Sequence, residues 1–383
     1  MHKLSAVDHL DRLIAFNTVS SRSNTALIDW IEVFCRQYSA RVRRFPNNAG
    51  DKTCLFVSLG PDALGGIVLS AHTDVVPTEG QAWHADPFTM RRDHGRLIGR
   101  GATDMKGFIA CCLAVVPHVS RLSLKRPLHL ALSYDEEVSS DGVQPMADWL
   151  GRSGLDPALA IIGEPSSMQV VTAHKGGLLN RVRIKGKPGH SSQPDRHVNA
   201  VMVAAQLIAH IEAVQRELRA GPVFSGLDPA YSTTQVNMVH GGTAQNIVAE
   251  HCEFSWEARF IPGQDDLAMV EAVKAFAARE LEPAMKAIDN ACGIEFIIEA
   301  HVPALRPNAN ADLERHLMEL LGQSAPKAVS YGSEAGIFQA AGVPAIICGP
   351  GDIAQAHQPE EFIAQSDLDS CVDFLVKVAG TLT

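Results

Sequence analysis

The sequence predicts an α/β protein built on a mostly parallel sheet with helices on both faces, interrupted by a second domain. Short apolar runs such as Gly66-Ile-Val-Leu69 and Ala158-Leu-Ala-Ile-Ile162 alternate with helical patterns, as in βαβ units. The middle of the chain instead follows the order βαββαβ, which is ferredoxin-like. The 383 residues are also enough for two domains.

The outer domain is expected to comprise residues 1–177 and 303–383. Apolar residues at helical spacing, beginning with Leu4, Val7 and Leu10, predict the first helix. Further helices are expected near residues 25–40, 108–118, 311–322 and 366–380, and strands near 54–58, 66–70, 128–134, 158–162 and 344–348. The passage from Trp83 to Gly99 carries turn signals and is expected to be mostly loop.

The inserted domain is expected to comprise residues 178–302. Its βαββαβ elements are predicted at 178–185, 198–219, 232–239, 251–260, 265–282 and 293–300. Such a unit has an open sheet edge or a free helix face, so self-association as a homodimer is expected. We therefore expect this domain to serve as a lid or as a dimerisation domain.

Composition and charge restrict the class of partner. The chain is 46% hydrophobic and 20% charged, with a net charge of −10, which argues against nucleic acid or an anionic membrane surface. No apolar run is long enough to span a bilayer, and the first residues show helical spacing rather than a signal peptide. The 8 cysteines are scattered without a C-x-x-C pair, as expected for free thiols in the cytoplasm.

The segment Ser70-Ala-His-Thr-Asp-Val-Val-Pro77 marks the first candidate site. His72 and Asp74 lie where a buried strand ends, and in α/β sheets ligands gather at that end of the strands. Two residues apart on extended chain, they point to the same side. They suit a metal-binding histidine whose other ring nitrogen donates to an aspartate, although a strand-end histidine and a turn aspartate without a metal fit equally well.

Further acidic and imidazole side chains follow other strands. A lone carboxylate at a strand end is usually a cap or turn residue, but several around one sheet edge are harder to explain in that way. Histidine and carboxylate are suitable ligands for two zinc ions, and a free carboxylate must then accept the proton of the attacking water. The candidates are His72, Asp104, Glu136, Glu137, Glu164 and His357.

Several motifs together resemble the M20 family of zinc amidohydrolases and peptidases. They are His72-Thr-Asp74, Gly101-Ala-Thr-Asp-Met-Lys-Gly107, Asp135-Glu-Glu137, Gly163-Glu-Pro165 and Ala356-His357. The resemblance covers nearly the whole chain, including the insertion. It implies two zinc ions per subunit, for which cobalt can substitute.

The resemblance also implies a role for each matching residue. One zinc ion would be held by His72, Asp104 and Glu164, and the other by Asp104, Glu137 and His357, so that Asp104 bridges them. Glu136 would be the general base and then the proton donor, and Asp74 would orient His72.

Within the family, five further stretches resemble enzymes that hydrolyse N2-acetylornithine to ornithine and acetate in arginine biosynthesis. They are Thr172-Ala-His-Lys-Gly176, Gly189-His-Ser-Ser192, Gly241-Gly-Thr-Ala-Gln-Asn246, Tyr331-Gly-Ser-Glu-Ala-Gly336 and Cys348-Gly-Pro-Gly351. Ser333 departs from the threonine expected in the fourth stretch.

Four residues are expected to contact this small N-acyl amino acid. His190 is the candidate donor to the oxyanion, and in relatives the matching histidine reaches the partner subunit's active site. Arg259 and Asn246 are candidates for binding the α-carboxylate, for which arginine offers a two-pronged donor. Glu334 could pair with the side-chain ammonium, or simply be an acid at a helix N-terminus.

Two other functions remain open at this point. Another amidohydrolase of the family, such as a succinyl-diaminopimelate desuccinylase, an aminoacylase or a dipeptidase, would keep the metal ligands and differ in its pocket. A non-catalytic binding protein would keep only the fold. The presence of Glu136 beside a full ligand set argues against that alternative, because binding alone requires no free base.

Overall fold

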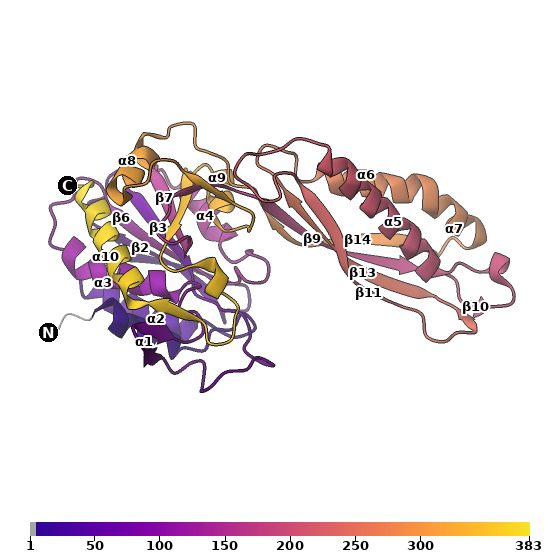
Figure 1. Cartoon of the computed structure of the whole chain (residues 1–383), viewed down its shortest axis with the longest axis horizontal. Helices are drawn as coiled ribbons and strands as arrows, with labels where there is room; N and C mark the ends of the chain where they lie inside the picture. Colours follow the sequence, from indigo (N-terminus) through magenta and orange to yellow (C-terminus); the bar gives the residue numbers. More distant parts are fainter. Residues whose placement is uncertain (1–4) are drawn as a thin grey trace. The chain divides into compact units, whose positions relative to one another are not determined.

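The computed structural model describes residues 5–383, and these form two compact units (Figure 1). The first unit contains the chain up to Ala173 together with Leu305–Ala328 and Ser333–Thr383. The second contains His174–Ala304 and the short segment Val329–Gly332. The return of Val329–Gly332 to the second unit was not expected from the sequence.

The first unit is organised around one eight-stranded sheet whose centre is parallel. Strand β3 pairs in parallel with β6 and β7, and β7 pairs in parallel with β16, whereas β1–β2, β2–β6 and β8–β16 are antiparallel. The expected α/β class with a largely parallel sheet is therefore confirmed. The strand order is β1 (Arg41–Pro46), β2 (Thr53–Leu59), β6 (Leu128–Ser133), β3 (Ile67–His72), β7 (Leu159–Pro165), β16 (Ala345–Gly349), β8 (Val171–His174) and β15 (Lys327–Val329).

Helices cover both faces of this sheet. Residues at one set of alternating strand positions, such as Leu69 and Ile161, share a core with five helices, while their neighbours Val68 and Ile162 are equally buried on the opposite face. The five helices are α1 (Ala6–Ile14), α2 (Thr25–Arg36), α3 (Lys106–Val119), α8 (Asp312–Leu321) and α10 (Gln365–Gly380). The remaining helices of this unit are α4 (Gln144–Arg152) and α9 (Ala335–Ala340), of which α9 contacts β7 and β16.

Local sequence explains where α1 begins and why α3 is buried. Ser5 and Asp8 form a reciprocal capping box at the start of α1. Leu4, where the first helix was expected to start, lies outside the described residues. Helix α3 is apolar almost all round and is buried along nearly its whole length, as its position between the sheet, α1 and α10 requires.

The passage from Trp83 to Gly99 contains a β-hairpin that was not expected. Strands β4 (Arg91–Asp93) and β5 (Arg96–Ile98) are joined by His94 and Gly95, whose φ values of 45° and 80° suit a two-residue hairpin turn. Strand β17 (Phe362–Ala364) pairs with β5 and completes a three-stranded sheet. The pairing brings the C-terminal segment against the residues that precede α3.

The second unit has the expected ferredoxin-like architecture. Its antiparallel sheet has the order β11 (Thr233–Gly241), β13 (His251–Phe260), β9 (Gly176–Lys185) and β14 (Gly293–Val302). One face packs on α5 (Ala200–Arg219), α6 (Ala268–Phe276) and α7 (Glu282–Ile288). The single helix expected at 265–282 is instead α6 and α7 joined by the π-helical segment Ala277–Leu281.

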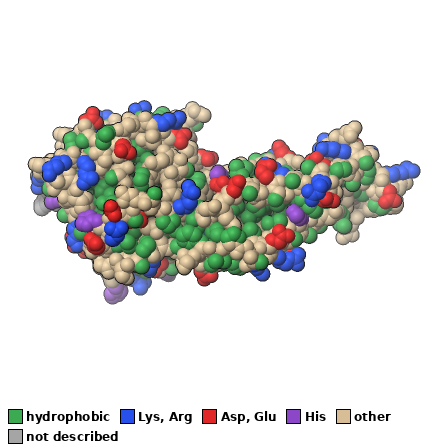
Figure 2. Space-filling model, turned by 90° about the horizontal axis from the view of Figure 1, so that it is seen from above, with side chains coloured by type: hydrophobic (Ala, Val, Ile, Leu, Met, Phe, Trp, Pro, Cys, Tyr) green, Lys and Arg blue, Asp and Glu red, His purple; other side chains and the backbone are tan. Residues whose placement is uncertain are grey.

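The surface carries mixed charge. On the face shown in Figure 2, acidic and basic side chains are interspersed, with apolar side chains grouped between them. The net charge of −10 is therefore not gathered into one acidic region on that face. Within residues 5–383, no helix has the length and apolarity needed to cross a bilayer.

Candidate metal centre and active site

Most of the candidate ligands end or follow four neighbouring parallel strands of the first unit, whereas Asp104 stands in the loop just before α3. His72 is the last residue of β3, and Glu164 lies near the end of β7. Glu136 and Glu137 follow β6, and His357 follows β16 and a short 3-10 turn, Ile353–Gln355. Because β6, β3, β7 and β16 lie side by side in this order, their carboxyl ends meet at one edge of the sheet.

The carboxylate of Asp104 is shared between the two histidines. Its Oδ1 lies 3.0 Å from Nε2 of His72, and its Oδ2 lies 3.3 Å from Nε2 of His357. His357 Nε2 is also 3.0 Å from Oε2 of Glu137. One aspartate thus faces both imidazoles with different oxygens, and its role as a bridging ligand stays a prediction.

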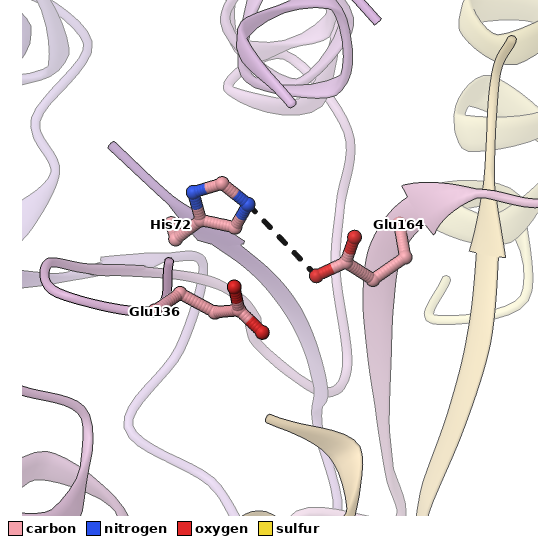
Figure 3. Close-up of side chains that lie close together, drawn as sticks. All are labelled: His72, Glu136 and Glu164. Carbon is pink, nitrogen blue, oxygen red and sulfur yellow. Dashed lines mark ion pairs between the residues drawn. The ribbon is translucent and has the colours of Figure 1, made fainter. Parts of the chain in front are cut away.

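Glu164 and Glu136 complete the other side of the group (Figure 3). Oε1 of Glu164 is 3.9 Å from Nε2 of His72, and the Glu136 carboxyl extends toward the same space. The ligand atoms of His72, Glu136 and Glu164 all lie within 4.8 Å of one another, as do those of His72, Asp104 and Glu137. Glu136 is therefore as close as a ligand would be, which the sequence did not indicate.

Asp74 acts as a buried acceptor behind these residues. Its carboxylate accepts hydrogen bonds from Oγ of Ser20 at 2.7 Å and from the backbone N–H groups of Glu136 at 3.2 Å and Glu137 at 3.3 Å. The expected bond from His72 is different in detail: Nδ1 lies 3.0 Å from the backbone oxygen of Asp74 and 3.6 Å from its carboxylate. Asp74 thus orients the Glu136–Glu137 turn as well as His72.

The turn before Glu136 is fixed by a lysine. Asp135 has a φ of 62°, a conformation uncommon for a residue with a side chain. Its carboxylate accepts a hydrogen bond from Nζ of Lys52 at 2.5 Å, and the same Nζ donates to the backbone oxygen of Ser20. The segment carrying the two glutamates is therefore held from both sides.

The electrostatics of the cluster suit a bound cation. Burial and the neighbouring charge of Glu164 raise the pKa of Glu136. Burial and the charge of Asp104 likewise raise the pKa values of Glu137 and Glu164. Without a cation, so many close carboxylates disfavour one another's charge, and Oε1 of Glu137 is buried without a hydrogen-bond partner. The residues present therefore fit the ligand set of a divalent metal.

Glu334 belongs to the same unit but is enclosed. It lies at the N-cap of α9 and its side chain is only 1% exposed. Burial raises the pKa of Glu334 to about 7. At neutral pH its carboxyl therefore carries only part of the negative charge that pairing with an ammonium needs. Its expected contact with substrate stays a prediction.

The other three expected substrate residues lie in the second unit, in two separate places. His190 ends the short strand β10 (Gly189–His190), which pairs with β12 (Ile247–Val248), and Asn246 accepts a hydrogen bond from the N–H of Ser191 at 3.2 Å. Both are exposed, beyond the Lys185–His251 end of the main sheet.

Arg259 lies at the opposite end of that sheet, paired with Gly177. Its Nε donates to Oε1 of Glu257 at 2.6 Å. The strand between Cys252 and Arg259 spans about 20–25 Å at the rise of an extended chain. Within one chain, Arg259 is therefore not brought together with His190 and Asn246.

A parallel sheet that presents two histidines and several buried carboxylates at its strand ends is the arrangement of a metal-dependent hydrolase. Residues 68–381 match the model of Peptidase family M20/M25/M40. The chain belongs to this family and is an enzyme of its metal-dependent hydrolase class.

Solved structures with a similar fold agree in architecture along the whole chain. An M20 family metallo-carboxypeptidase from Sulfolobus solfataricus aligns with a TM-score of 0.76 at 16% identity, covering 98% of each chain. A di-peptidase from Saccharomyces cerevisiae aligns at 0.70 and 14%, covering 98% of this chain and 95% of its own. A dinuclear metal-binding M20 peptidase from Bacillus subtilis aligns at 0.68 and 13%, covering 98% and 97%. At these identities the likeness establishes the fold alone.

Proposed function

We propose that this enzyme hydrolyses the amide bond of N2-acetyl-L-ornithine to give L-ornithine and acetate, the reaction of an acetylornithine deacetylase in arginine biosynthesis. The observation that carries the hydrolytic part is the Asp104 carboxylate placed between His72 and His357. The substrate is supported by the resemblance of segments such as Gly241–Asn246 and Tyr331–Gly336 to those of enzymes with this activity.

The proposed metal ligands divide into two sets that share Asp104. His72 and Glu164 would complete one set, and Glu137 and His357 the other. We propose zinc as the metal, with two ions per subunit and cobalt as a substitute, because imidazole and carboxylate suit zinc. When bound, such ions polarise an amide carbonyl and lower the pKa of water toward about 7.

Glu136 is proposed as the general base. Its carboxyl lies beside His72 and Glu164, and it is the acidic member of the cluster that the two ligand sets leave unused. Burial and the charge of Glu164 raise its pKa, which suits a group that takes a proton and returns it. The proton accepted from water would pass from Glu136 to the departing amine of ornithine. Asp74 holds the backbone of Glu136 in place for both transfers.

The separation of Arg259 from His190 and Asn246 supports a homodimer. If all three residues contact one substrate, Arg259 must come from one subunit and His190 with Asn246 from another, since they lie at opposite ends of the same sheet. We propose Arg259 and Asn246 as partners of the α-carboxylate and His190 as the donor to the oxyanion.

An unpaired sheet edge offers the surface for this dimer. Strand β11 is an edge strand, and its Met238 and Val239 are 55% and 54% exposed. The neighbouring Met202 of α5 is 60% exposed. A long edge with exposed apolar side chains favours pairing with another chain. We propose that two copies of β11 and α5 meet here.

A dipeptidase or another amidohydrolase of the family is the alternative. The ligand sets would be the same, and the choice depends on the groups that contact the acyl and amino-acid parts. A cytoplasmic location is proposed with the biosynthetic role, in keeping with the 8 free and buried cysteines.

A hydrolysis panel on zinc-loaded protein, with a chelated control, tests the proposal. The panel contains N2-acetylornithine, N-succinyl-diaminopimelate, other N-acetyl amino acids and dipeptides. Chelator-sensitive release of ornithine is the expected result. Rapid chelator-sensitive turnover of another amide without ornithine release would retain the hydrolase and replace the substrate. No turnover of any member with zinc bound would contradict both.

A further inference from the structure

Glu361 binds the loop that carries Asp104. Its carboxylate is 1% exposed, and four donors converge on it. Oε2 accepts from Nη1 of Arg100 at 2.8 Å and from the N–H of Gly101 at 2.9 Å. Oε1 accepts from the N–H groups of Thr103 at 2.9 Å and Asp104 at 3.0 Å. A single buried carboxylate thus fixes the backbone of the residues leading into Asp104.

The same network reaches the other metal-ligand segment. Nη1 of Arg100 also donates to the backbone oxygen of Gln358 at 3.3 Å, and Nη2 donates to Oε1 of Gln81. Nε2 of Gln81 then donates to the backbone oxygen of His357 at 2.9 Å. His357 has a φ of 62°, so its backbone occupies a conformation that needs outside support.

Burial and contacts with Trp83 restrain the side chains of this network. Arg100 is as buried as Glu361, with each side chain 1% exposed, and the ring of Trp83 lies 5.2 Å from its guanidinium. Nε1 of Trp83 donates to Oε1 of Gln81 at 3.1 Å. Hydrogen bonds to a charged, buried acceptor are stronger and more directional than neutral ones, so the network restrains its ends firmly.

We propose that Glu361, with Arg100 and Gln81, is a positioning residue that presets Asp104 and His357 to bind both metal ions. The inference rests on the proposed function of Asp104 and His357 as ligands. Metal ligands bind best when their orientation is fixed before the ion arrives, and the loss of such outer partners typically weakens binding by about 10–100-fold. Glu361 itself contacts no metal in this arrangement; it acts through the backbone of Asp104.

The neighbouring residue provides a matched control. Glu360 has the same side chain, but its carboxylate binds the N–H of His84 at 2.9 Å and the guanidinium of Arg91. It makes no hydrogen bond to the Asp104 loop. Glu360→Gln and Glu361→Gln therefore remove the same charge at adjacent positions, and only the second places an amide NH₂ against backbone donors that need an acceptor.

The experiment is a titration of metal-free protein with Zn²⁺ by calorimetry and with Co²⁺ by visible absorption. We expect two ions per chain for wild type and Glu360→Gln. For Glu361→Gln we expect at least about 10-fold weaker binding and altered Co²⁺ absorption, with turnover partly restored at high Co²⁺. Wild-type affinity and spectrum in a folded Glu361→Gln protein would overturn the proposal.

A second variant decides the matter if Glu361→Gln fails to fold by circular dichroism. Gln81→Leu removes the bond to the His357 oxygen and leaves the Arg100–Glu361 pair intact. If one ion binds more weakly and the other is unchanged, the proposal is supported. If both ions bind with wild-type affinity, the proposal is overturned. If wild type itself binds no ion, the proposed function fails instead, so the two failures are distinguishable.

Discussion

His357 and Glu137 are 220 residues apart in the sequence, yet Nε2 of the histidine lies 3.0 Å from Oε2 of the glutamate. The contact joins a segment that follows β16 to the turn after β6, two strands that are separated in the sheet by β3 and β7. Two parts of the first unit that lie far apart in the sequence thus contribute to one group of candidate metal-binding side chains, and several of the predictions below depend on that group.

Removing individual ligands should remove metal ions in a defined pattern. Asp104→Ala should abolish tight binding of both ions because its carboxylate faces both histidines, whereas His357→Ala should leave one. Each change should lower turnover by more than the 10–100-fold typical of an outer partner. Metal content after dialysis, measured by mass spectrometry, checks the pattern. His84→Ala, at a 82% exposed histidine outside the group, is the control. Two ions retained by Asp104→Ala would refute the bridging role.

Glu136→Gln should abolish turnover while the fold and the metal content are kept. The amide cannot accept a proton, and general-base catalysis contributes about 10²–10⁴-fold to rate. The value of kcat on the best substrate of the panel, together with metal analysis, is the measurement. An unchanged kcat would exclude Glu136 as the base. Loss of one ion would instead show that Glu136 is a ligand, which its distance from His72 and Glu164 allows.

The proposed contribution of His190 from a second subunit predicts complementation. His190→Ala and Glu136→Gln proteins should each be nearly inactive alone. After denaturation, mixing and refolding with metal, about a quarter of all sites should contain both wild-type residues if dimers form at random. Recovery of activity on mixing, measured alongside the molar mass in solution, checks this. No recovery from a confirmed mixed dimer would place His190 and Glu136 of one chain at the same site.

Arg259→Ala should raise KM for substrates with a free α-carboxylate by about 10–100-fold, since a hydrogen bond to a charged group contributes about 1.5–3 kcal/mol. Substrates whose carboxylate is blocked as an amide should be affected little. Arg183→Ala is a suitable control because Arg183 binds Glu253 on the same sheet. Equal losses on free and blocked substrates would argue that Arg259 does not bind the carboxylate.

Stability should fall with acid in part because of His9. This residue is buried next to Phe34, and burial lowers its pKa to about 4. The unfolded chain takes up the proton near pH 6.5, so the stabilisation by neutral His9 is complete above about pH 6.5 and is lost as the pH falls toward 4.

His9→Leu should therefore flatten the pH dependence of the unfolding free energy between these values by on the order of 3 kcal/mol. Urea unfolding of metal-free protein at several pH values measures the difference from wild type. The same substitution at His94, whose side chain is 94% exposed, is the control for the loss of a histidine. An identical slope for His9→Leu and wild type would mean that another group causes the acid sensitivity.

Much of the fold could be predicted because long elements have a clear period. Strand β13 was expected at 251–260 and is observed at His251–Phe260, and α10 begins one residue before its expected start. Strands β4 and β5 were missed because three residues are too few to show alternation. Helix α4 was missed as well, although Pro145 stands in its first turn.

The metal-binding group could be anticipated for a different reason. All of its side chains except Asp104 end or follow buried parallel strands, and the ends of such strands converge, so position along the chain was enough to collect them. The role of Glu361 could not be found in this way. It accepts from backbone N–H groups, and these are present at every residue except proline and leave no pattern in the sequence.

The place of β16 in the sheet has a consequence for how the protein is made. Strand β16 docks between β7 and β8, and it follows the whole second unit in the chain. A ribosome synthesises more than 340 residues before this strand can fill its position. Until then β7 is paired only with β3, and the candidate ligand His357, which follows β16, has not been synthesised. Closing so long a loop is slow, so we expect the central sheet and the candidate metal centre to be completed only late in folding.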